Sequence, residues 1–178
     1  IAVKIYGEVS TKTAPTQKLL ADIDYQIGDY DNAEANIAKA LASQQKQFGR
    51  NHIEVAKCIA QFALIKFYHK GDRKEVERLL LESRDIMGNK LGKDNPQYAE
   101  ILKSVAILYI SEKRFDIAFS SLTQAEQIWR SKTGRKRNIN AASIYALTGD
   151  VYYQQKNYVK AEEFYNKAKD LYERFFSR

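Results

Sequence analysis

The sequence is poor in the residues on which many catalytic and cross-linked proteins depend. Its 178 residues include one Cys, two His, two Pro and eight Gly. One Cys excludes a disulfide within the chain and any zinc or iron–sulfur site built from several cysteines. Two Pro and eight Gly are few for an all-β protein, which needs many turns. No apolar run approaches the roughly 18 residues of a membrane span, and no signal-peptide pattern is present.

The few side chains with reactive groups do not form a catalytic set. Cys58 lies in an apolar run and is predicted to be a small core residue. His52 stands where a helix is expected to begin and can cap it, and His69 stands at an expected helix end, where an imidazolium suits the helix dipole. Neither has a ligand partner at a spacing that persists along the chain, and no Gly-rich phosphate loop is present. We therefore predict no enzymatic activity, no catalytic residue, no metal site and no cofactor.

The net charge is +7, from 29 Lys and Arg against 22 Asp and Glu. Most of it comes from one short segment without an acidic residue, which contains Arg130, Lys132, Arg135, Lys136 and Arg137. Three interpretations are open: a solvated loop without a partner, a contact for an acidic protein or anionic surface, and a nucleic-acid contact, because phosphate binding needs clustered cations. No aromatic residues are interleaved with these cations, which argues against single-strand binding.

A repeat of about 42 residues organises the chain, and a repeat is the first feature to settle in a new sequence. Residues 108–129 match residues 151–172 at a step of 43, with aromatic and Ala positions in common. Further steps of 42 and 43 toward the N-terminus give two more units. We predict a single array from 1 to 178, divided into 1–13 (the remnant of a preceding repeat and a linker), 14–52, 53–95, 96–137 and 138–178.

Each unit is predicted to contain two helices. Small and apolar residues recur at steps of three and four in the second helix, as in Ala33, Ile37 and Ala40, which is the pattern of a buried helix face. Gly28 and Gly71 are expected to supply a left-handed residue between the two helices of a unit. The predicted first helices are 14–27, 53–69, 96–112 and 138–155, and the predicted second helices are 30–47, 73–89, 115–132 and 158–176.

Both ends of the array are expected to be open. Residues 1–7 have the pattern of the end of a preceding second helix, so the chain is predicted to be a fragment of a longer one. The last helix carries Leu171, Tyr172, Phe175 and Phe176, and no polar capping helix follows it. More chain, or a second copy forming a homodimer through this end, would cover them.

The spacing of small and aromatic residues resembles that of the tetratricopeptide repeat. The clearest unit has Gly149, Tyr152, Tyr158, Ala161, Tyr165 and Ala168. The long period and the run from Leu91 to Tyr109 are similar to kinesin light chains and to bacterial tetratricopeptide proteins, some of which carry a caspase-like protease domain. This resemblance implies an all-α, right-handed superhelical solenoid of antiparallel helix pairs, with about four repeats and a partial N-terminal helix.

Two ligand-binding patterns of such proteins are missing. The Leu-Asn-Asn-Leu-Ala segment of kinesin light chains is replaced by residues 102–106, which contain no Asn. Lys18 and Lys103 could serve as lysines of a carboxylate clamp, but Asp22 and Ile107 stand where that clamp needs Asn.

The first helices line the concave surface of a helix-pair solenoid, and this surface is where we predict that a protein or peptide ligand binds. The groove candidates are Lys18, Asp22, Tyr25, Gln61, Ile65, Tyr68, Lys103, Ile107, Ile110, Ser143, Asp150 and Tyr153. The predicted function is a protein–protein interaction scaffold. Two alternatives are a sensory or regulatory array of a larger enzyme or transcription regulator, and nucleic-acid contact through 130–137.

Overall fold

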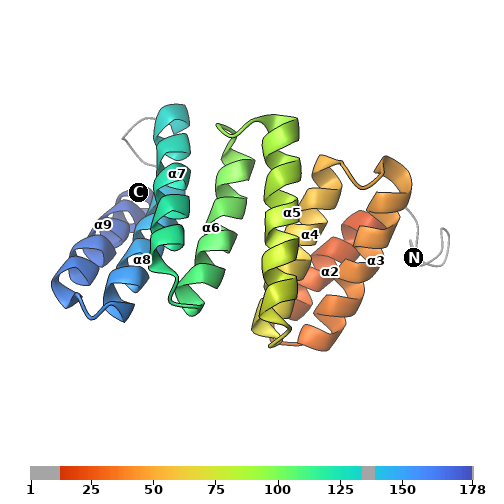
Figure 1. Cartoon of the computed structure of the whole chain (residues 1–178), viewed down its shortest axis with the longest axis horizontal. Helices are drawn as coiled ribbons and strands as arrows, with labels where there is room; N and C mark the ends of the chain where they lie inside the picture. Colours follow the sequence, from red (N-terminus) through yellow and green to blue (C-terminus); the bar gives the residue numbers. More distant parts are fainter. Residues whose placement is uncertain (1–12, 134–138, 178) are drawn as a thin grey trace. The chain divides into compact units, whose positions relative to one another are not determined.

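A computed structural model describes residues 13–133 and 139–177 of the chain, and these residues form eight helices and no strand (Figure 1). In the first half of the chain they are α2 (Ala14–Gln26), α3 (Tyr30–Phe48), α4 (Ile53–Tyr68) and α5 (Arg73–Leu91). In the second half they are α6 (Pro96–Ser111), α7 (Phe115–Thr133), α8 (Ile139–Gln154) and α9 (Tyr158–Phe176). Every predicted helix is confirmed, with bounds within two residues of those expected. The predicted remnant at 1–7 lies outside the described residues.

Capping side chains begin α4 and α6. The Nδ1 atom of His52 accepts a hydrogen bond from the backbone N–H of Glu54 at 3.2 Å, which confirms the predicted cap of α4. Asn95 caps α6 in the same way, since its side chain accepts from the N–H of Gln97 at 2.8 Å and Pro96 follows it. These side chains satisfy N–H groups that the first helical turn leaves without a partner.

The turns inside the helix pairs correct one prediction. Gly28 has a positive φ of 82°, as expected, but in the next pair the left-handed residue is Lys70 (φ 63°) and not Gly71. The N–H of Gly71 instead donates to the carbonyl oxygen of Lys66 at 2.7 Å, and a Cβ atom there would lie 3.0 Å from that oxygen. Gly at 71 therefore lets the two backbone segments approach closely, and a larger residue would have to move this carbonyl by a few tenths of an ångström. Asp72 then caps α5, so this turn is one residue longer than the one at Gly28.

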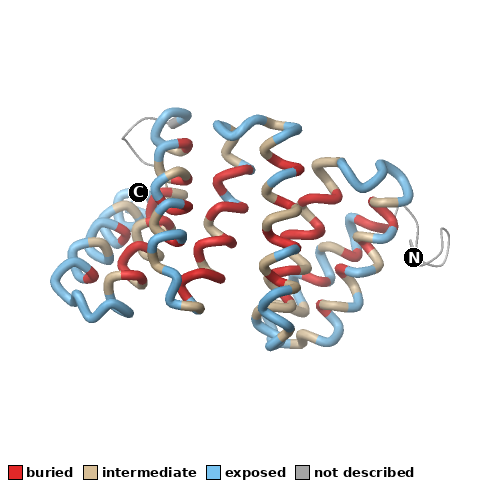
Figure 2. Tube along the Cα trace, in the orientation of Figure 1, coloured by how far each residue is buried: buried red, intermediate tan, exposed pale blue. Residues whose placement is uncertain are grey.

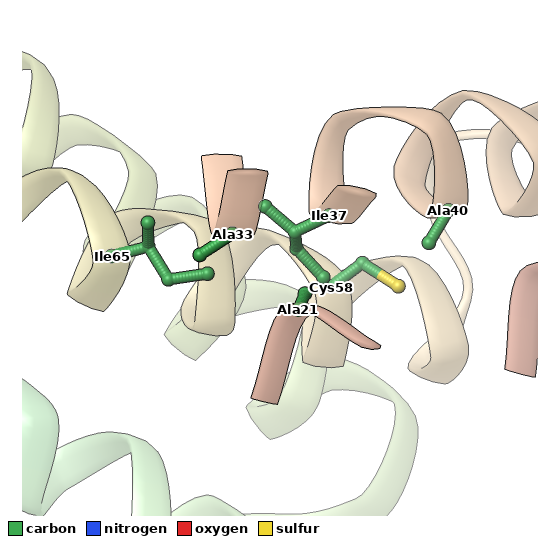
Figure 3. Close-up of a cluster of buried hydrophobic side chains, with 6 residues drawn as sticks. All are labelled: Ala21, Ala33, Ile37, Ala40, Cys58 and Ile65. Carbon is green, nitrogen blue, oxygen red and sulfur yellow. The ribbon is translucent and has the colours of Figure 1, made fainter. Parts of the chain in front are cut away.

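The chain divides into two compact units, residues 1–90 (unit 1) and 91–178 (unit 2), and each contains two of the helix pairs. The core of unit 1 includes a cluster from α2, α3 and α4: Ala21, Ala33, Ile37, Ala40, Cys58 and Ile65 (Figure 3). Ala21, Ile37 and Cys58 meet at its centre, and Cys58 has no exposed surface, which confirms it as a core residue. Small side chains let the helices approach closely, and the large ones fill the space between them.

Unit 2 uses the same ladder of small and large residues. Ala118, Leu122 and Ala125 of α7 are buried, and α6 is buried along most of its length (Figure 2). In the last pair the ladder changes, because Tyr165 takes the large position and lies directly on Gly149 of α8. A Cβ atom at Gly149 would lie 2.6 Å from the Tyr165 ring, so the absence of a side chain at 149 makes room for the tyrosine.

Candidate binding surfaces

Each unit carries part of the predicted groove on its first helices. In unit 1 the predicted residues that have exposed surface are Lys18, Asp22, Tyr25, Gln61 and Tyr68, and we call them the α2–α4 surface. In unit 2 an open pocket of about 410 Å³, which we call the α6–α8 pocket, lies between the two first helices. Its lining residues are Glu100, Lys103, Ser104, Ile107, Ser143, Ala146, Leu147 and Tyr172.

The α2–α4 surface is held together by contacts between the two first helices. The Gln61 Nε2 atom donates to Asp22 Oδ1 at 2.5 Å and to the carbonyl oxygen of Lys18 at 3.4 Å. Farther along, the rings of Tyr25 and Tyr68 meet edge to face with centroids 5.5 Å apart. Burial and the neighbouring Tyr68 raise the pKa of Tyr25 to about 12, so its hydroxyl stays neutral at physiological pH. The surface therefore offers two aromatic rings beside an acid–amide pair.

The α6–α8 pocket combines one cation with an apolar wall. The Lys103 ammonium is mostly buried and lies 2.7 Å from a carboxylate oxygen of Glu100 and 3.0 Å from the Ser143 hydroxyl oxygen, to which it donates a hydrogen bond. Ile107, Ala146 and Leu147 supply apolar surface next to these groups. A pocket of this kind suits an apolar side chain whose backbone can hydrogen-bond to the charged rim.

Two predicted groove residues are buried and have almost no surface that a ligand could contact. Ile65 belongs to the core cluster of unit 1, and Ile110 is buried in unit 2, so both are removed from the set. The longer turn at 70–72 explains the error for Ile65, because it shifts the register of α4 by one residue. The position in α4 that corresponds to Asp22 and Ile107 is Leu64, not Ile65.

The remaining predicted residues of the last pair lie outside the pocket lining. Asp150 accepts a hydrogen bond from the Tyr165 hydroxyl at 2.7 Å and is therefore engaged within unit 2. Burial and this hydrogen bond raise the pKa of Tyr165 to about 12. Tyr153 is exposed and contacts Tyr158 edge to face at 5.6 Å. Of the predicted groove residues in unit 2, the pocket thus brings together Lys103, Ile107 and Ser143.

Sequence reasoning missed part of the pocket wall. Ala146 and Leu147 follow Ser143 at helical steps of three and four, so the spacing could have revealed them. Tyr172 could not be found in this way, because it comes from second helix α9 and was expected on the open end of the array. Only the packing of α9 against α8 brings it to the pocket.

The basic segment is described only in part. Arg130 lies in the last turns of α7, 3.2 Å from a carboxylate oxygen of Glu126, which also accepts a hydrogen bond from Tyr145 at 2.9 Å. Lys132 is exposed near the end of the same helix. Arg135, Lys136 and Arg137 lie outside the described residues. The nucleic-acid contact proposed for this segment stays a prediction.

The groups with potential reactivity have structural roles. Burial raises the pKa of the Cys58 thiol to about 11, so it is protonated at neutral pH. His69 contacts two carboxylates that its sequence neighbours do not supply, Glu34 at 3.1 Å and Asp31 at 3.5 Å, both from α3. Among the described residues no group of three or more His, Cys, Asp or Glu could hold a metal ion. None of the described helices is long and apolar enough to cross a membrane.

The helix pairs, their period and the Gly149–Tyr165 contact agree with a family match. A family model described as Tetratricopeptide repeat matches residues 12–89 and 98–174. The chain belongs to the tetratricopeptide repeat family. Tetratricopeptide repeats generally mediate protein–protein interaction, and their fold is generally a non-enzymatic scaffold.

Solved structures with the same architecture include BtubC (BKLC) from P. vanneervenii, with a TM-score of 0.75 and 19% identity. That match covers 90% of this chain and 63% of the other. A putative kinesin light chain with nearly identical TPR-like repeats from Podosopora anserina has a TM-score of 0.69 and 17% identity, covering 99% of this chain and 82% of the other. At these identities the likeness concerns the fold alone.

Curated relatives include proteins named clustered mitochondria protein homolog. Those of Danio rerio and Homo sapiens are each 23% identical over 94% of this chain, and that of Candida albicans is 24% identical over 97%. The chain spans only 12 to 13% of the length of these relatives.

Proposed function

We propose that the chain is a protein-interaction module that holds peptide segments of partner proteins on the α2–α4 surface and in the α6–α8 pocket, without catalysis. The observation that carries this proposal is the open α6–α8 pocket. It combines the Lys103 ammonium with apolar walls, and three of its residues stand at positions expected for the groove of a tetratricopeptide array.

The chemistry of the pocket defines the kind of segment it takes. Its volume of about 410 Å³ leaves room for one or two large side chains. Lys103 and Ser143 already form a hydrogen bond that fixes the position of the ammonium in the pocket. A peptide with an apolar anchor would bury it against Ile107 and Leu147, while its backbone carbonyl groups accept hydrogen bonds from the rim.

A peptide display library selected on the 178-residue chain provides the test. Binding of the selected peptides is measured by fluorescence anisotropy for the wild type and for Ile107→Asp, which places a charge on the apolar wall. We expect at least a tenfold loss of affinity, because the apolar anchor would face a carboxylate. Ile117→Asp, at an exposed isoleucine of α7 outside the pocket, is the matched control and should bind within about twofold of wild type.

Both surfaces are tested together by replacing Tyr68, Lys103 and Tyr153 with Ala. This triple variant should lose the selected peptides and keep its helicity, since Tyr68 and Tyr153 are exposed and Ala favours a helix at position 103. Unchanged affinity in both Ile107→Asp and the triple variant would refute the assignment of the ligand surface.

A second candidate function is a regulatory array in a larger enzyme or transcription regulator. It is favoured by the length of the curated relatives, of which the chain spans 12 to 13%. The complete reading frame tests it: an additional catalytic or DNA-binding domain would support the candidate, and the absence of any further domain would eliminate it.

A further inference from the structure

Most carboxylates in the described part of unit 1 are engaged by a basic side chain or by a helix terminus. Contacts with a Lys, Arg or His nitrogen engage Asp31, Glu34, Glu54, Glu75, Glu82 and Asp85. Asp29 and Asp72 accept hydrogen bonds from the first turns of α3 and α5. Among the described residues, Asp22 and Asp24 of α2 have no basic partner. Asp24 is partly buried and accepts a hydrogen bond from Asn36 at 2.8 Å, whereas Asp22 is exposed.

Asp22 lies on the α2–α4 surface with one hydrogen bond and no ion pair to the described residues. Its Oδ1 atom accepts from the Gln61 Nε2 atom at 2.5 Å. Lys18 precedes it by four residues, a spacing that allows an ion pair in a helix, but the two side chains do not form one. The charge of Lys18 acts on Glu54 instead, where it adds to the hydrogen bond from Lys57 that lowers the pKa of this carboxyl. The Asp22 carboxylate is therefore open to a cation from a binding partner.

The aromatic residues of α4 show the same contrast. The Lys66 ammonium lies over the Phe62 ring, 4.9 Å from its centroid, and the Arg73 guanidinium lies over the Phe67 ring at 4.1 Å. No cation of the described residues lies over the ring of Tyr68, which is 41% exposed. Because aromatic faces attract cations, two rings of α4 are already occupied by the chain itself and the third, on the α2–α4 surface, is open.

The open carboxylate and the open ring belong to one surface. Tyr25 follows Asp22 at a helical step of three and therefore lies on the same side of α2. The ring of Tyr25 contacts that of Tyr68, with centroids 5.5 Å apart, and Gln61 joins the same two helices at Asp22. A carboxylate beside aromatic rings favours a guanidinium, because this planar group bonds to a carboxylate through two N–H groups and also stacks on a ring.

We propose that the α2–α4 surface binds an arginine side chain of a partner peptide, whose guanidinium pairs with Asp22 and stacks on Tyr25 and Tyr68. This inference rests on the proposed function, because it names the side chain that one of the two surfaces recognises. The Gln61 amide fixes the Asp22 carboxylate, and each carboxylate oxygen can still accept a further hydrogen bond. Lysine fits less well, since an ammonium forms no paired hydrogen bonds with a carboxylate and does not stack.

The peptides selected on the 178-residue chain provide the probe, and we expect one of their positions to be enriched in arginine. Fluorescence anisotropy compares such a peptide with its citrulline version, which keeps the planar head group but not the charge, on the wild type and on Asp22→Asn. Each change alone should weaken binding about three- to tenfold. The two changes together should cost no more than one of them, because both remove the same ion pair.

Two further variants locate the contact. Tyr68→Leu removes the ring at an exposed position and should weaken the arginine peptide about threefold, and the citrulline peptide less. Asp24→Asn is the matched control, because it removes a carboxylate from the same helix at the position that bonds to Asn36. Its affinity should stay within about twofold of wild type. Circular dichroism verifies that all three variants keep their helicity.

Several outcomes would overturn this inference. Peptides that lose affinity for Ile107→Asp but bind Asp22→Asn like the wild type would refute the arginine site and leave the proposed function of the α6–α8 pocket in place. Peptides that need Asp22 but carry lysine or no cation would refute arginine as the occupant. Equal losses in Asp22→Asn and Asp24→Asn would show a general attraction to α2 and no defined site. Unchanged affinity in Ile107→Asp, the triple variant and Asp22→Asn would overturn the proposed function as well.

Discussion

In unit 1 helix α3 packs against α4, and in unit 2 helix α7 packs against α8; we call these contacts the α3–α4 joint and the α7–α8 joint. The two joints use equivalent positions, but the side chains at those positions are charged in unit 1 and aromatic in unit 2. In unit 1 the Lys66 ammonium lies between carboxylates of Glu34 at 2.9 Å and Glu75 at 3.3 Å, and His69 also contacts Glu34. In unit 2 the equivalent pair is Phe119 and Tyr152. Phe164 stacks on the same tyrosine, with centroids 5.5 Å apart.

Beneath these pairs the two joints are alike. Each second helix presents a ladder of Ala, a large aliphatic residue and Ala, and all of these side chains are buried. The ladder fixes the approach of the helices, so the pair above it can be ionic or aromatic without changing the fold. This difference determines how the stability of each unit depends on salt and pH. Ion pairs are screened by salt and titrate with pH, whereas contacts between aromatic rings do neither.

Truncating the large aliphatic residue of the ladder should have the largest effect on stability. Ile37→Ala leaves a cavity in the core of unit 1 and should lower the free energy of unfolding by about 2–4 kcal/mol, measured by urea denaturation. Leu122→Ala at the same position of unit 2 should cost a similar amount. Ile117→Ala, at an exposed position of α7, serves as control and should stay within about 0.5 kcal/mol of wild type. If either core variant lost no more than this control, the ladder would not be what the two joints share.

Adding a methyl group at Gly149 should have the next largest effect. The Cβ atom of Gly149→Ala would lie 2.6 Å from the Tyr165 ring, and the ring cannot stay in place beside it. Overpacking costs about 1–3 kcal/mol and helix propensity returns about 1 kcal/mol, so we expect the free energy of unfolding to fall by up to about 2 kcal/mol.

Tyr165→Leu should rescue Gly149→Ala, because the preceding pair combines Ala106 with Leu122 at the same positions. Thermal unfolding of the two single variants and the double variant measures this coupling. Additive effects in the three variants would contradict the proposed steric cause.

Glu34→Gln tests the ionic joint directly. It removes the charge that pairs with Lys66 and His69, and should cost about 1 kcal/mol at low ionic strength, because these groups are partly exposed. The cost should shrink as salt is added, whereas the cost of Phe119→Leu in unit 2 should not depend on salt. Equal salt dependence of the two variants would erase the contrast between the joints.

The pH dependence of the same joint follows from the pKa of Glu34. Burial raises this pKa, but hydrogen bonds from Lys66 and His69, together with their charges, outweigh burial and hold it below its usual value. The stabilisation from Glu34 is thus fully present above the unfolded-state pKa of about 4.3 and is lost as the pH falls through the lower folded-state value. Urea denaturation from pH 6 to pH 3 should show the wild type losing its advantage over Glu34→Gln. A constant difference over that range would contradict the pKa shift.

Modification of Cys58 should show the smallest effect. The thiol is buried and its pKa is raised to about 11, so a thiol reagent at pH 8 should leave it almost unmodified in the folded chain. Modification should become rapid when urea unfolds unit 1, and absorbance of the released chromophore measures its rate. Fast modification without urea would show that the α3–α4 joint opens in the native state.

Much of the architecture was predictable because the same pattern of small and apolar residues recurs in every repeat. The steps of small and apolar residues in the second helices, together with the cap at His52 and the repeat itself, were enough to place all eight described helices. The register of α4 was predicted wrongly. Gly28 and Gly71 align in the sequence, but the left-handed residue of the second turn is Lys70. The alignment does not reveal the extra residue in this turn, although that residue changes which side chains of α4 are equivalent to those of the other first helices.

Residues of the candidate surfaces were predictable only where their spacing along a single helix determines which side they face. Lys103 and Ser143 were expected in the groove, yet their hydrogen bond joins residues 40 positions apart in two helices. Tyr172 reaches the same pocket from α9, and Glu34 and Asp31 reach His69 from α3. Contacts of this kind depend on how helices pack, and the spacing along one helix does not contain that information.

The amino-acid sequence by itself determined the helix pairs, their period and the family, because helical periodicity and capping are local properties of the chain. Tertiary structure decided which residues form the pocket, and which of the two joints is ionic and which is aromatic. The physical reason is that these features belong to pairs of helices, where one residue of turn length or one missing Cβ atom, as at Gly149, changes which side chains meet.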